Sequence, residues 1–372
     1  MDPFKFGQVV SGKDFCPRPG LIKHVRDYIK QGQNMYVQGE RRIGKTSLIY
    51  EACLHLKKYR TVYVDLFGVK SSDILAKRIV KAIISMEQKE SGFFSKIFET
   101  FSHLRPSFTV DPITGLPSIS LDATVKMTPD DIETVLDLIA AMQTSKKPVV
   151  VVFDEFQDIL KLKDADETLA MMRSKIQFQS HIPYVFTGSL RNKMDEIFID
   201  PESPFFKSAI LVAVGPLAET SFKNFIIKRF ENGGRSINAN ALEQVFEIAG
   251  KVSGDIQQLC SALWSISTTG DSIEQNSIPK AVELIFAREA KVYEADINII
   301  SEQQFKCLAG IARYGGKALT SSQFLMKIGI PSSASVLKAL ERLIQLRILL
   351  KSGDEYKFTN PFFRAWLLYK NF

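Results

Sequence analysis

The stretch Gly39-Glu40-Arg41-Arg42-Ile43-Gly44-Lys45-Thr46 decides the fold class of this chain of 372 residues. It fits the pattern G-x-x-x-x-G-K-[S/T], follows a predicted strand at Asn34–Gln38 and precedes a helical pattern at Ser47–Leu56. Glycines in such a loop let consecutive backbone N–H groups turn toward phosphate oxygens, and the helix N-terminus adds its dipole. The stretch therefore predicts a phosphate-binding loop in an α/β fold.

Two side chains of the loop indicate which ligand it holds. Lys45 would reach the β- and γ-phosphates of ATP, and the Thr46 hydroxyl would ligate Mg²⁺. ATP and Mg²⁺ are therefore the expected cofactors. The residues expected to surround the phosphates are Gly39, Glu40, Arg41, Arg42, Ile43, Gly44, Lys45, Thr46 and Ser47.

A second predicted strand ends in two carboxylates. Val149–Asp154 is a continuous apolar run up to its last residue, and Glu155 follows directly. A buried strand with this ending brings its acidic residues to the edge of the sheet, where a cation can meet them. Asp154 would hold magnesium through water, and Glu155 would orient and activate the attacking water. With the phosphate loop, this pair predicts ATP hydrolysis.

Residues 1–215 alternate short apolar runs with helix-period segments, which is typical of a parallel sheet sandwiched by helices. The predicted strands are Asn34–Gln38, Thr61–Leu66, Val149–Asp154, Tyr184–Gly188 and Ile210–Val214. An insertion at about residues 91–128 interrupts this alternation, with a Phe-rich segment at Gly92–Leu104 and strand-like pieces at Ser107–Val110 and Ser118–Asp122. We interpret it as a helix and a β-hairpin, either an extra sheet edge or an arm that contacts a partner.

The remaining residues predict two further domains. A helical pattern with glycine breaks indicates a helical lid at residues 216–298. Three helical segments and a strand pair around Ser352-Gly353-Asp354 indicate a winged helix at residues 299–372. In that fold the third helix enters the major groove and the wing meets phosphate. The candidate DNA contacts are Ser332, Ser335, Lys338, Arg342, Lys351 and Lys357.

The net charge of +7 lies in the last domain. Residues 301–372 hold eleven basic and four acidic side chains, so residues 1–300 are neutral in sum. Such asymmetry points to an anionic partner, for which duplex DNA is the first candidate. Docking of this domain on a partner protein is the alternative, and a purely structural role is the third. The third helix would place Leu337, Leu340, Leu343 and Ile344 in the core.

Composition disfavours other classes of protein. The four cysteines form no C-x-x-C pair and lie at no ligand spacing from the histidines, so neither a disulfide framework nor a zinc site is expected. No apolar run approaches the ~18 residues of a membrane span. The first residues lack the layout of a signal peptide. We therefore expect a cytoplasmic protein that makes no membrane contact.

Beyond these patterns, the chain resembles the prokaryotic "archaeal ATPase" family of the AAA+/STAND branch, which is related to origin-recognition initiators. In the first half the matching residues are Phe6-Gly7, Val10, Gly12, Asp14-Phe15, Arg18, the phosphate loop through Ser47, and Asp154-Glu155-Phe156-Gln157. Later matches are Phe186-Thr187-Gly188-Ser189, Ser203-Pro204-Phe205-Phe206, and Thr359-Asn360-Pro361-Phe362 with Trp366. The resemblance covers most of the chain and is weakest at residues 91–128.

The resemblance implies an AAA+ core, a helical lid and a winged helix. It also implies that Ser189 or Thr187 senses the γ-phosphate. Val10 and Arg18 would lie near the adenine or the ribose. The family relationship further allows a homo-oligomer in which a neighbour supplies an arginine.

Two departures from the family pattern bear on the rate of hydrolysis. Gly254-Asp255-Ile256 is followed by Gln257, where relatives with an initiator-like lid place an arginine. The loop after Ser189 often carries an arginine near its end in the family, and this chain has Lys207-Ser208 there. Arg191 and Arg229 remain as candidates for a cation that acts on a neighbour's nucleotide. We therefore expect a slowly hydrolysing ATP switch that controls contact with DNA or a partner protein. The alternative is a non-hydrolysing, ATP-bound scaffold for signalling or assembly.

Overall fold

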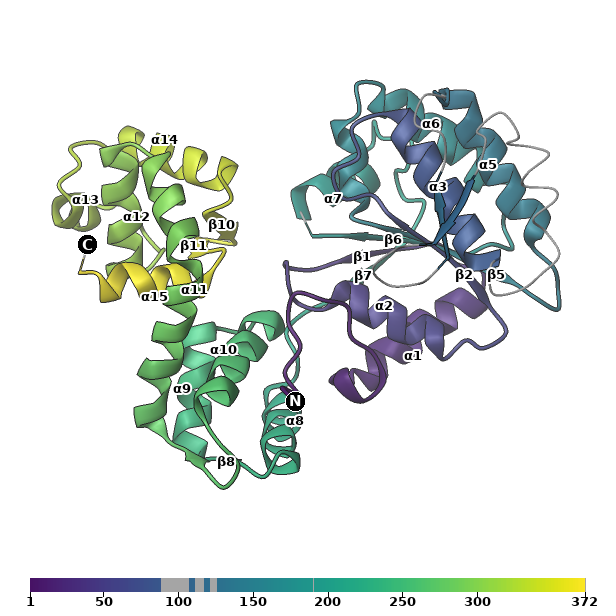
Figure 1. Ribbon diagram of the computed structural model, residues 1–372. Helices are drawn as coiled ribbons and strands as arrows, with labels where there is room; N and C mark the ends of the chain where they lie inside the picture. Colours follow the sequence, from purple (N-terminus) through teal and green to yellow (C-terminus); the bar gives the residue numbers. More distant parts are fainter. Residues whose placement is uncertain (88–106, 111–116, 121–125, 190, 372) are drawn as a thin grey trace. The chain divides into compact units, whose positions relative to one another are not determined.

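The computed structural model describes residues 1–87, 107–110, 117–120, 126–189 and 191–371 (Figure 1). Two compact units divide the chain. One is Val9–Gly215, and the other combines Met1–Gln8 with Pro216–Phe372. The chain therefore passes between the units twice, at residues 8–9 and at residues 215–216. In the part of the chain that the structure describes, no helix is long and apolar enough to cross a membrane.

A five-stranded parallel sheet forms the centre of the unit Val9–Gly215. In spatial order its strands are β2 (Arg60–Asp65), β5 (Val149–Asp154), β6 (Tyr184–Gly188), β1 (Met35–Gln38) and β7 (Ile210–Ala213). Every residue of β1, β5 and β6 is buried, as expected for apolar strands covered on both faces. Because the strands are parallel, the segments that follow β1, β5 and β6 meet at one edge of the sheet.

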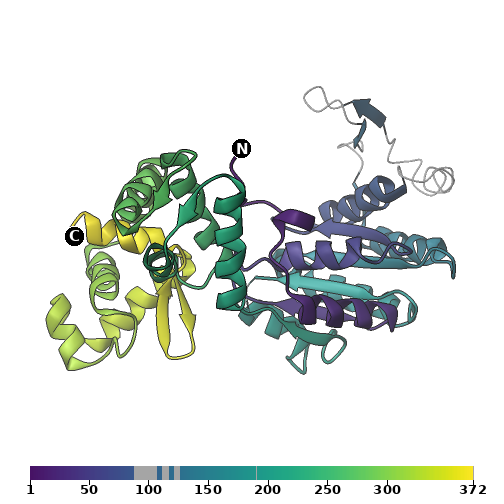
Figure 2. The same ribbon diagram turned by 90° about the horizontal axis from the view of Figure 1, so that it is seen from below.

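Helices cover both faces of this sheet (Figure 1). On one face α1 (Pro19–Lys30) and α2 (Lys45–Leu54) lie side by side, as the view from below also shows (Figure 2). The other face carries α3 (Ser72–Glu87), α5 (Pro129–Met142), α6 (Ala165–Ile176) and α7 (Arg191–Phe198). Short 3₁₀ turns lie at η1 (Gly12–Asp14) and η3 (Phe156–Lys161). Each face of the sheet packs against its helices in a separate buried apolar cluster, so the strands contribute to two hydrophobic cores.

The hairpin of the insertion is present as β3 (Ser107–Val110) and β4 (Pro117–Ser120), paired antiparallel. These two strands form a sheet of their own and do not extend the five-stranded sheet. The Phe-rich segment expected to be helical, Gly92–Leu104, lies outside the described residues.

The helices of the second unit begin with α8 (Glu219–Asn232), α9 (Ala239–Ala249), α10 (Ser253–Ile266) and α11 (Ile278–Asn298). A short turn η4 (Gln275–Ser277) and two short parallel strands, β8 (Ser236–Ile237) and β9 (Ser272–Ile273), connect them. The first residues of the chain pack here, although the alternating pattern assigned them to residues 1–215. Phe4 is 2% exposed, and its ring centroid lies 4.7 Å from that of Phe230 and 6.2 Å from that of Trp264.

The last domain contains α12 (Glu302–Tyr314), α13 (Ser322–Ile328), α14 (Ser333–Gln345), β10 (Leu349–Ser352), β11 (Glu355–Phe358) and α15 (Pro361–Tyr369). The side chains of Ser301, Ser321 and Ser332 cap the first three helices, each accepting a backbone N–H from the first turn. Strands β10 and β11 pair antiparallel as the wing. Helix α11 joins this domain to the lid, since Tyr293 stacks on Phe363 at 5.0 Å.

We predict that Phe4→Ala lowers the free energy of unfolding of the second unit by about 3–5 kcal/mol, because the cavity left among Phe230 and Trp264 cannot be filled by solvent. Denaturant unfolding followed by Trp264 fluorescence, in a Trp366→Phe background, measures it. The control is Phe178→Ala, whose side chain is 82% exposed and should cost less than about 0.5 kcal/mol. Equal effects of the two changes would show that the N-terminal segment does not pack here.

Candidate ATP site

Two glycines of the phosphate loop are required by its geometry. Gly44 precedes α2 with φ 94°, a left-handed conformation that residues with a Cβ rarely adopt. Gly39 passes so close to the neighbouring chain that a Cβ there would lie 2.4 Å from the carbonyl oxygen of Val214. No side chain caps the N-terminus of α2, so its first N–H groups are available to an anion.

Lys45 lies at the start of α2, and only 6% of its surface is exposed. Its ammonium donates to the carbonyl oxygens of Gly39 at 3.0 Å and Glu40 at 2.9 Å, so it curls over the loop. Burial lowers its pKa, and the nearby charges of Glu155 and Asp154 partly oppose that effect. A buried ammonium beside uncapped N–H groups is suited to bind phosphate oxygens. Ile43 is buried beneath the loop, whereas Glu40, Arg41 and Arg42 are exposed.

The carboxylate of Asp154 receives four hydrogen bonds. Its Oδ2 accepts from the hydroxyls of Thr46, at 2.8 Å, and Tyr63. Its Oδ1 accepts from the hydroxyl of Thr187 and from the backbone N–H of Glu155 at 3.0 Å. A carboxylate has about four acceptor positions, so in this state all of them are used.

One of these donors, Tyr63, lies on β2, and the sequence pattern predicts it only as a strand residue. Burial and, secondly, the charge of Asp154 raise the pKa of Tyr63, so the phenol stays protonated and donates. The contact arises because β2 pairs with β5, with Tyr63 opposite Val152. The apolar runs in the sequence predict the two strands but do not indicate that they are neighbours in the sheet.

Glu155 sits directly after β5 with φ 52°, a left-handed conformation that is costly for a residue with a Cβ and is often found at functional sites. Its Oε2 accepts from the hydroxyl of Ser189 at 2.8 Å and from the Gln157 amide at 2.5 Å. Ser189 and Thr187, the two candidate γ-phosphate sensors, thus contact different carboxylates. No pattern in the sequence assigns a separate role to Gln157 or to Tyr63.

The donor set suits magnesium more than a transition metal. Thr46 and Asp154 offer one hydroxyl and one carboxylate, and Mg²⁺ usually takes few protein oxygens and completes its six positions with water and phosphate. Among the described residues there is no group of three His, Cys, Asp or Glu side chains that could hold a metal ion. The residues present therefore fit Mg²⁺ bound together with a nucleotide.

Val10 and Arg18 lie against the phosphate loop. The N–H of Val10 donates to the hydroxyl of Ser47 at 3.1 Å. The Arg18 guanidinium donates to the carbonyl oxygens of Ile43 at 2.9 Å and Gly215 at 2.5 Å. Arg18 therefore ties the loop to the residue at which the chain leaves this unit.

Gln257, at the first departure from the family pattern, and the candidate cation Arg229 both have contacts within the second unit. Gln257 is 9% exposed, and its side-chain oxygen accepts from the backbone N–H of Lys5 at 3.3 Å. The Arg229 guanidinium donates to the carbonyl oxygen of Pro3 and lies 4.3 Å from the ring centroid of Phe225. The side chain of Arg191 is outside the described residues.

The candidate DNA contacts lie on α14 and on the wing. Ser332 uses its hydroxyl to cap α14, through the N–H of Ser335 at 3.2 Å. Lys338 and Arg342 are exposed on the helix, and Lys351 and Lys357 on the wing. The ammonium of Lys357 lies 3.3 Å from the carboxylate of Glu355.

The apolar residues of α14 divide between core and surface. Leu340 and Leu343 are buried as expected. Leu337 is 46% exposed and Ile344 is 37% exposed, so their placement in the core was wrong. Their seven-residue spacing puts both on one side of the helix.

We predict that Tyr63→Phe weakens the metal-free protein and strengthens Mg²⁺ binding. A hydrogen bond to a carboxylate contributes about 1.5–3 kcal/mol to stability, and its loss frees an acceptor for the water of the metal. Denaturant unfolding and calorimetric Mg²⁺ titration of the ATP-bound protein measure the two effects. Tyr50→Phe, which alters an exposed ring on α2, is the control. Unchanged stability and unchanged Mg²⁺ affinity would contradict this role of Tyr63.

Residues 15–259 match the family described as "ATPase domain predominantly from Archaea", and residues 291–369 match "Probable winged helix domain". A search of the curated proteins gave no match.

Solved structures share the fold at low sequence identity. A Walker-type ATPase of Pyrococcus abyssi aligns with a TM-score of 0.67 and 16% identity, covering 98% of this chain and 99% of that one. The Aeropyrum pernix ORC1 protein in complex with DNA aligns with a TM-score of 0.53 and 12% identity, covering 96% and 93%. The Aeropyrum pernix ORC2 protein gives 0.54 and 12%, covering 99% and 98%. The fold is thus that of AAA+ ATPases, and the chain belongs to the family of ATPase domains found predominantly in Archaea, with a C-terminal winged helix domain.

Proposed function

We propose that this protein is an ATP-binding, slowly hydrolysing switch whose nucleotide state controls the contact of its winged helix with duplex DNA. The observation that carries the proposal is the meeting of four groups at one edge of the sheet. Lys45 and Thr46 follow β1, and Asp154 and Glu155 end β5. The contact of 2.8 Å between Thr46 and Asp154 joins the two pairs.

In the proposed reaction each group has one task. Lys45 and the N–H groups of α2 bind the phosphates, and Thr46 and Asp154 hold Mg²⁺, which would neutralise charge on the phosphate oxygens. Glu155 accepts a proton from the attacking water, while Ser189 and Gln157 fix the orientation of its carboxylate.

The slow rate of ATP hydrolysis is proposed because two side chains of the second unit do not provide a cation for the transition state. Gln257 carries no charge, and Arg229 is engaged with Pro3 and Phe225. Removing one group that stabilises charge in the transition state costs factors of about 10² to 10⁵ in related reactions. A homo-oligomer in which a neighbour supplies an arginine would restore part of that loss.

The switch is supported by the two places where the chain crosses between the units. The first crossing, at residues 8–9, is next to Val10, whose N–H donates to Ser47 in the first turn of α2. The second, at residues 215–216, begins at Gly215, whose carbonyl is held by Arg18 together with that of Ile43. A shift of the phosphate loop on nucleotide binding would therefore act on both connections.

DNA is proposed as the partner because the excess charge of the chain lies in residues 301–372. The fold neighbour ORC1 was solved with DNA, which makes DNA the first ligand to test. A second candidate is docking on a protein, in the manner of an ATP-bound scaffold. The exposed apolar side chains of Leu337, Ile344 and Met326, the last 83% exposed, favour it.

We predict that Lys45→Ala reduces ATP affinity at least tenfold while the fold is kept, because the phosphates lose their buried ammonium. Isothermal calorimetry measures the affinity. Lys30→Ala, at the exposed end of α1, is the matched control. Wild-type affinity in Lys45→Ala would remove this loop from the proposed site.

We predict that Glu155→Gln binds ATP and Mg²⁺ as the wild type does but loses turnover by at least 10², since an amide cannot accept the proton. Asp154→Asn should instead raise the Mg²⁺ concentration that is needed. Single-turnover hydrolysis tests both. If wild-type protein does not hydrolyse ATP in a single turnover, with DNA or without it, the scaffold alternative replaces the switch.

We predict that the full chain binds duplex DNA with a log–log salt slope of about −3 to −4, from four phosphate contacts by Lys338, Arg342, Lys351 and Lys357. Each change to Ala should reduce the slope by roughly one, and changes at Ser332 or Ser335 should alter sequence preference more than affinity. Lys306→Ala, on α12, is the control. Absence of salt-dependent binding at low ionic strength, with and without ATP, would favour protein docking.

A further inference from the structure

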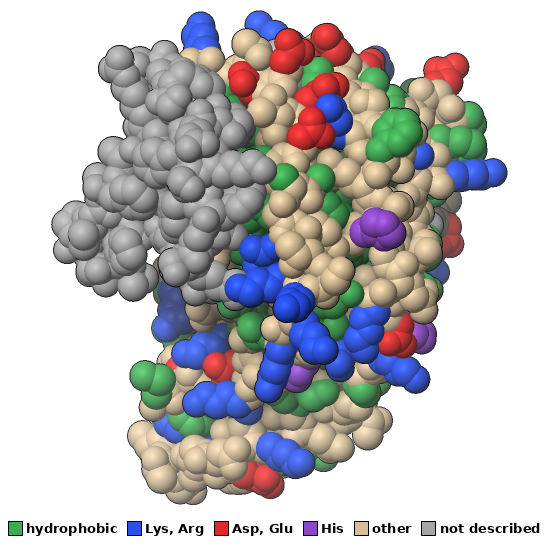
Figure 3. Space-filling view, turned by 90° about the vertical axis from the view of Figure 1, so that its right-hand side faces the viewer, with side chains coloured by type: hydrophobic (Ala, Val, Ile, Leu, Met, Phe, Trp, Pro, Cys, Tyr) green, Lys and Arg blue, Asp and Glu red, His purple; other side chains and the backbone are tan. Residues whose placement is uncertain are grey.

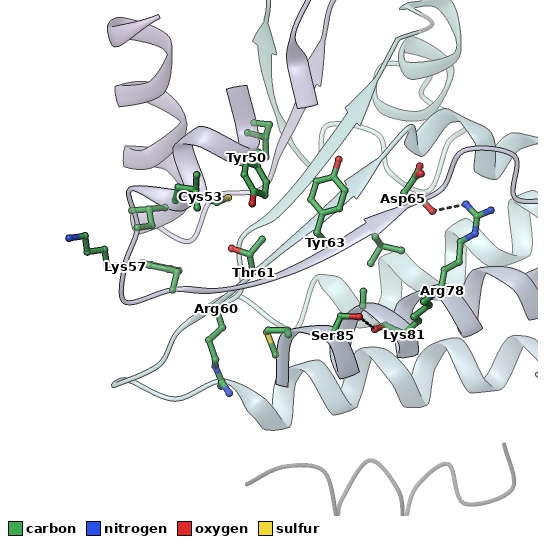
Figure 4. A pocket seen from close by; sticks show the side chains of 17 residues that line it. Tyr50, Cys53, Lys57, Arg60, Thr61, Tyr63, Asp65, Arg78, Lys81 and Ser85 are labelled. Atoms are coloured by element: carbon green, nitrogen blue, oxygen red, sulfur yellow. Dashed lines mark hydrogen bonds between the residues drawn. The ribbon is translucent and has the colours of Figure 1, made fainter. Parts of the chain in front are cut away.

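A groove of about 710 Å³ runs along strand β2, the last strand of the sheet on one side. Helix α2 borders it on one side and α3 on the other, and the strand between them forms its floor (Figure 4). Tyr50 and Cys53 project from α2, and Arg78, Lys81 and Ser85 from α3. The groove lies within the unit Val9–Gly215.

The backbone of β2 offers unpaired groups to this groove. Toward β5, the N–H of Arg60 donates to Pro148 at 2.8 Å and that of Leu66 to Asp154 at 2.9 Å. Since strand residues alternate, the N–H and C=O groups of Thr61, Tyr63 and Asp65 point to the outer side. Arg78 occupies the carbonyl of Asp65 at 2.6 Å. Among the described residues, the N–H and C=O groups of Thr61 and Tyr63 have no backbone partner.

The walls of the groove are apolar and its rim is basic. Its apolar lining residues are Ile49, Leu54, Leu56, Val64, Ala82 and Met86. Lys57, Arg60, Arg78 and Lys81 line it as cations, against Asp65 as the single carboxylate. The ammonium groups of Lys57 and Lys81 belong to exposed side chains. Basic side chains also gather in a band across the face drawn in Figure 3.

We propose that this groove binds an extended acidic segment of a partner protein, which adds to the sheet as a strand beside β2. Alternating donors and acceptors at Thr61 and Tyr63 match a peptide backbone in this mode of recognition. Apolar side chains in the middle of the segment would pack against the walls. Carboxylates at its ends would meet the exposed ammonium groups of Lys57 and Lys81.

The chemistry of the groove distinguishes this occupant from two others. The phosphodiester groups of a nucleic acid are acceptors and offer no donors to the carbonyls of Thr61 and Tyr63, and the apolar walls offer nothing to phosphate. A second copy of this chain, paired edge to edge, would bring the same four cations together, and like charges across an interface oppose association.

The groove also touches the candidate ATP site through one residue. The backbone of Tyr63 lies on the floor of the groove, and its hydroxyl donates to Asp154. A strand bound here would therefore restrain the residue that holds the carboxylate proposed for magnesium. Binding of the peptide itself requires neither ATP nor hydrolysis, so it can be tested separately from the proposed function.

Fluorescence anisotropy of labelled peptides with the full chain, without nucleotide, tests the proposal. The probes are Asp-Glu-Val-Ile-Val-Glu-Asp, versions with Leu or Phe in the apolar positions, the Lys-flanked counterparts, and an N-methylated version that cannot pair as a strand.

Two variants of the protein change the groove. Lys57→Glu with Lys81→Glu reverses the charge of its rim, and Thr61→Pro removes one outward N–H while leaving the hydrogen bonds to β5. Lys58→Glu, an exposed residue that does not line the groove, is the control.

The acidic probe should bind at least tenfold more tightly than the Lys-flanked or N-methylated one. The double charge reversal should weaken binding at least tenfold and Thr61→Pro about fivefold, with less than a twofold effect of Lys58→Glu. The proposal is overturned if no acidic probe binds, or if the groove variants bind as the wild type does. It is also overturned if binding appears only after residues 88–125 are replaced by a short linker, since the groove is then occupied by the chain itself.

Discussion

The hydrogen bond from the Thr46 hydroxyl to Asp154 Oδ2 joins two segments that are far apart in the sequence. It exists because β6 pairs with both β5 and β1, so that the carboxyl ends of the three strands share one edge. This arrangement is stabilised by the buried apolar side chains on both faces of the sheet, because displacing a strand would break their packing in the two cores. The candidate chemistry therefore depends on core packing: without this strand order, Lys45 and Glu155 would belong to different surfaces.

The N-terminal segment contacts side chains of the lid. The side-chain oxygen of Gln257 accepts the backbone N–H of Lys5 at 3.3 Å. Arg229 is likewise used on Pro3. With Phe4 buried between Phe230 and Trp264, the segment is anchored in the second unit a few residues before Val10 reaches α2. Gln257 and Arg229 of the lid are thus engaged by the same N-terminal segment that leads to Val10 and α2.

Local patterns in the sequence were enough to predict the phosphate loop, the acidic pair after β5 and the winged helix, because each depends on residues close in the chain. These local patterns do not predict contacts between segments that are far apart in the sequence. Tyr63 reaches Asp154 only because β2 lies beside β5, and periodicity does not determine which strands are neighbours. Leu337 and Ile344 show a related limit: a helical repeat identifies an apolar face, but tertiary packing decides how much of it is covered.

The distribution of charge along the sequence also differs from its distribution in the folded protein. Residues 1–300 are neutral in sum, yet the parallel sheet gathers several cations at one of its edges. Lys57, Lys58 and Arg60 lie before or at the start of β2, and Lys146 and Lys147 lie before β5. Pairing of these strands brings the turns together, with Arg60 donating to the carbonyl of Lys147 at 3.4 Å. The carboxylates of Asp154 and Glu155 are at the opposite ends of the strands. An anionic partner at the basic end would therefore be attracted without competing for the groups that would bind ATP.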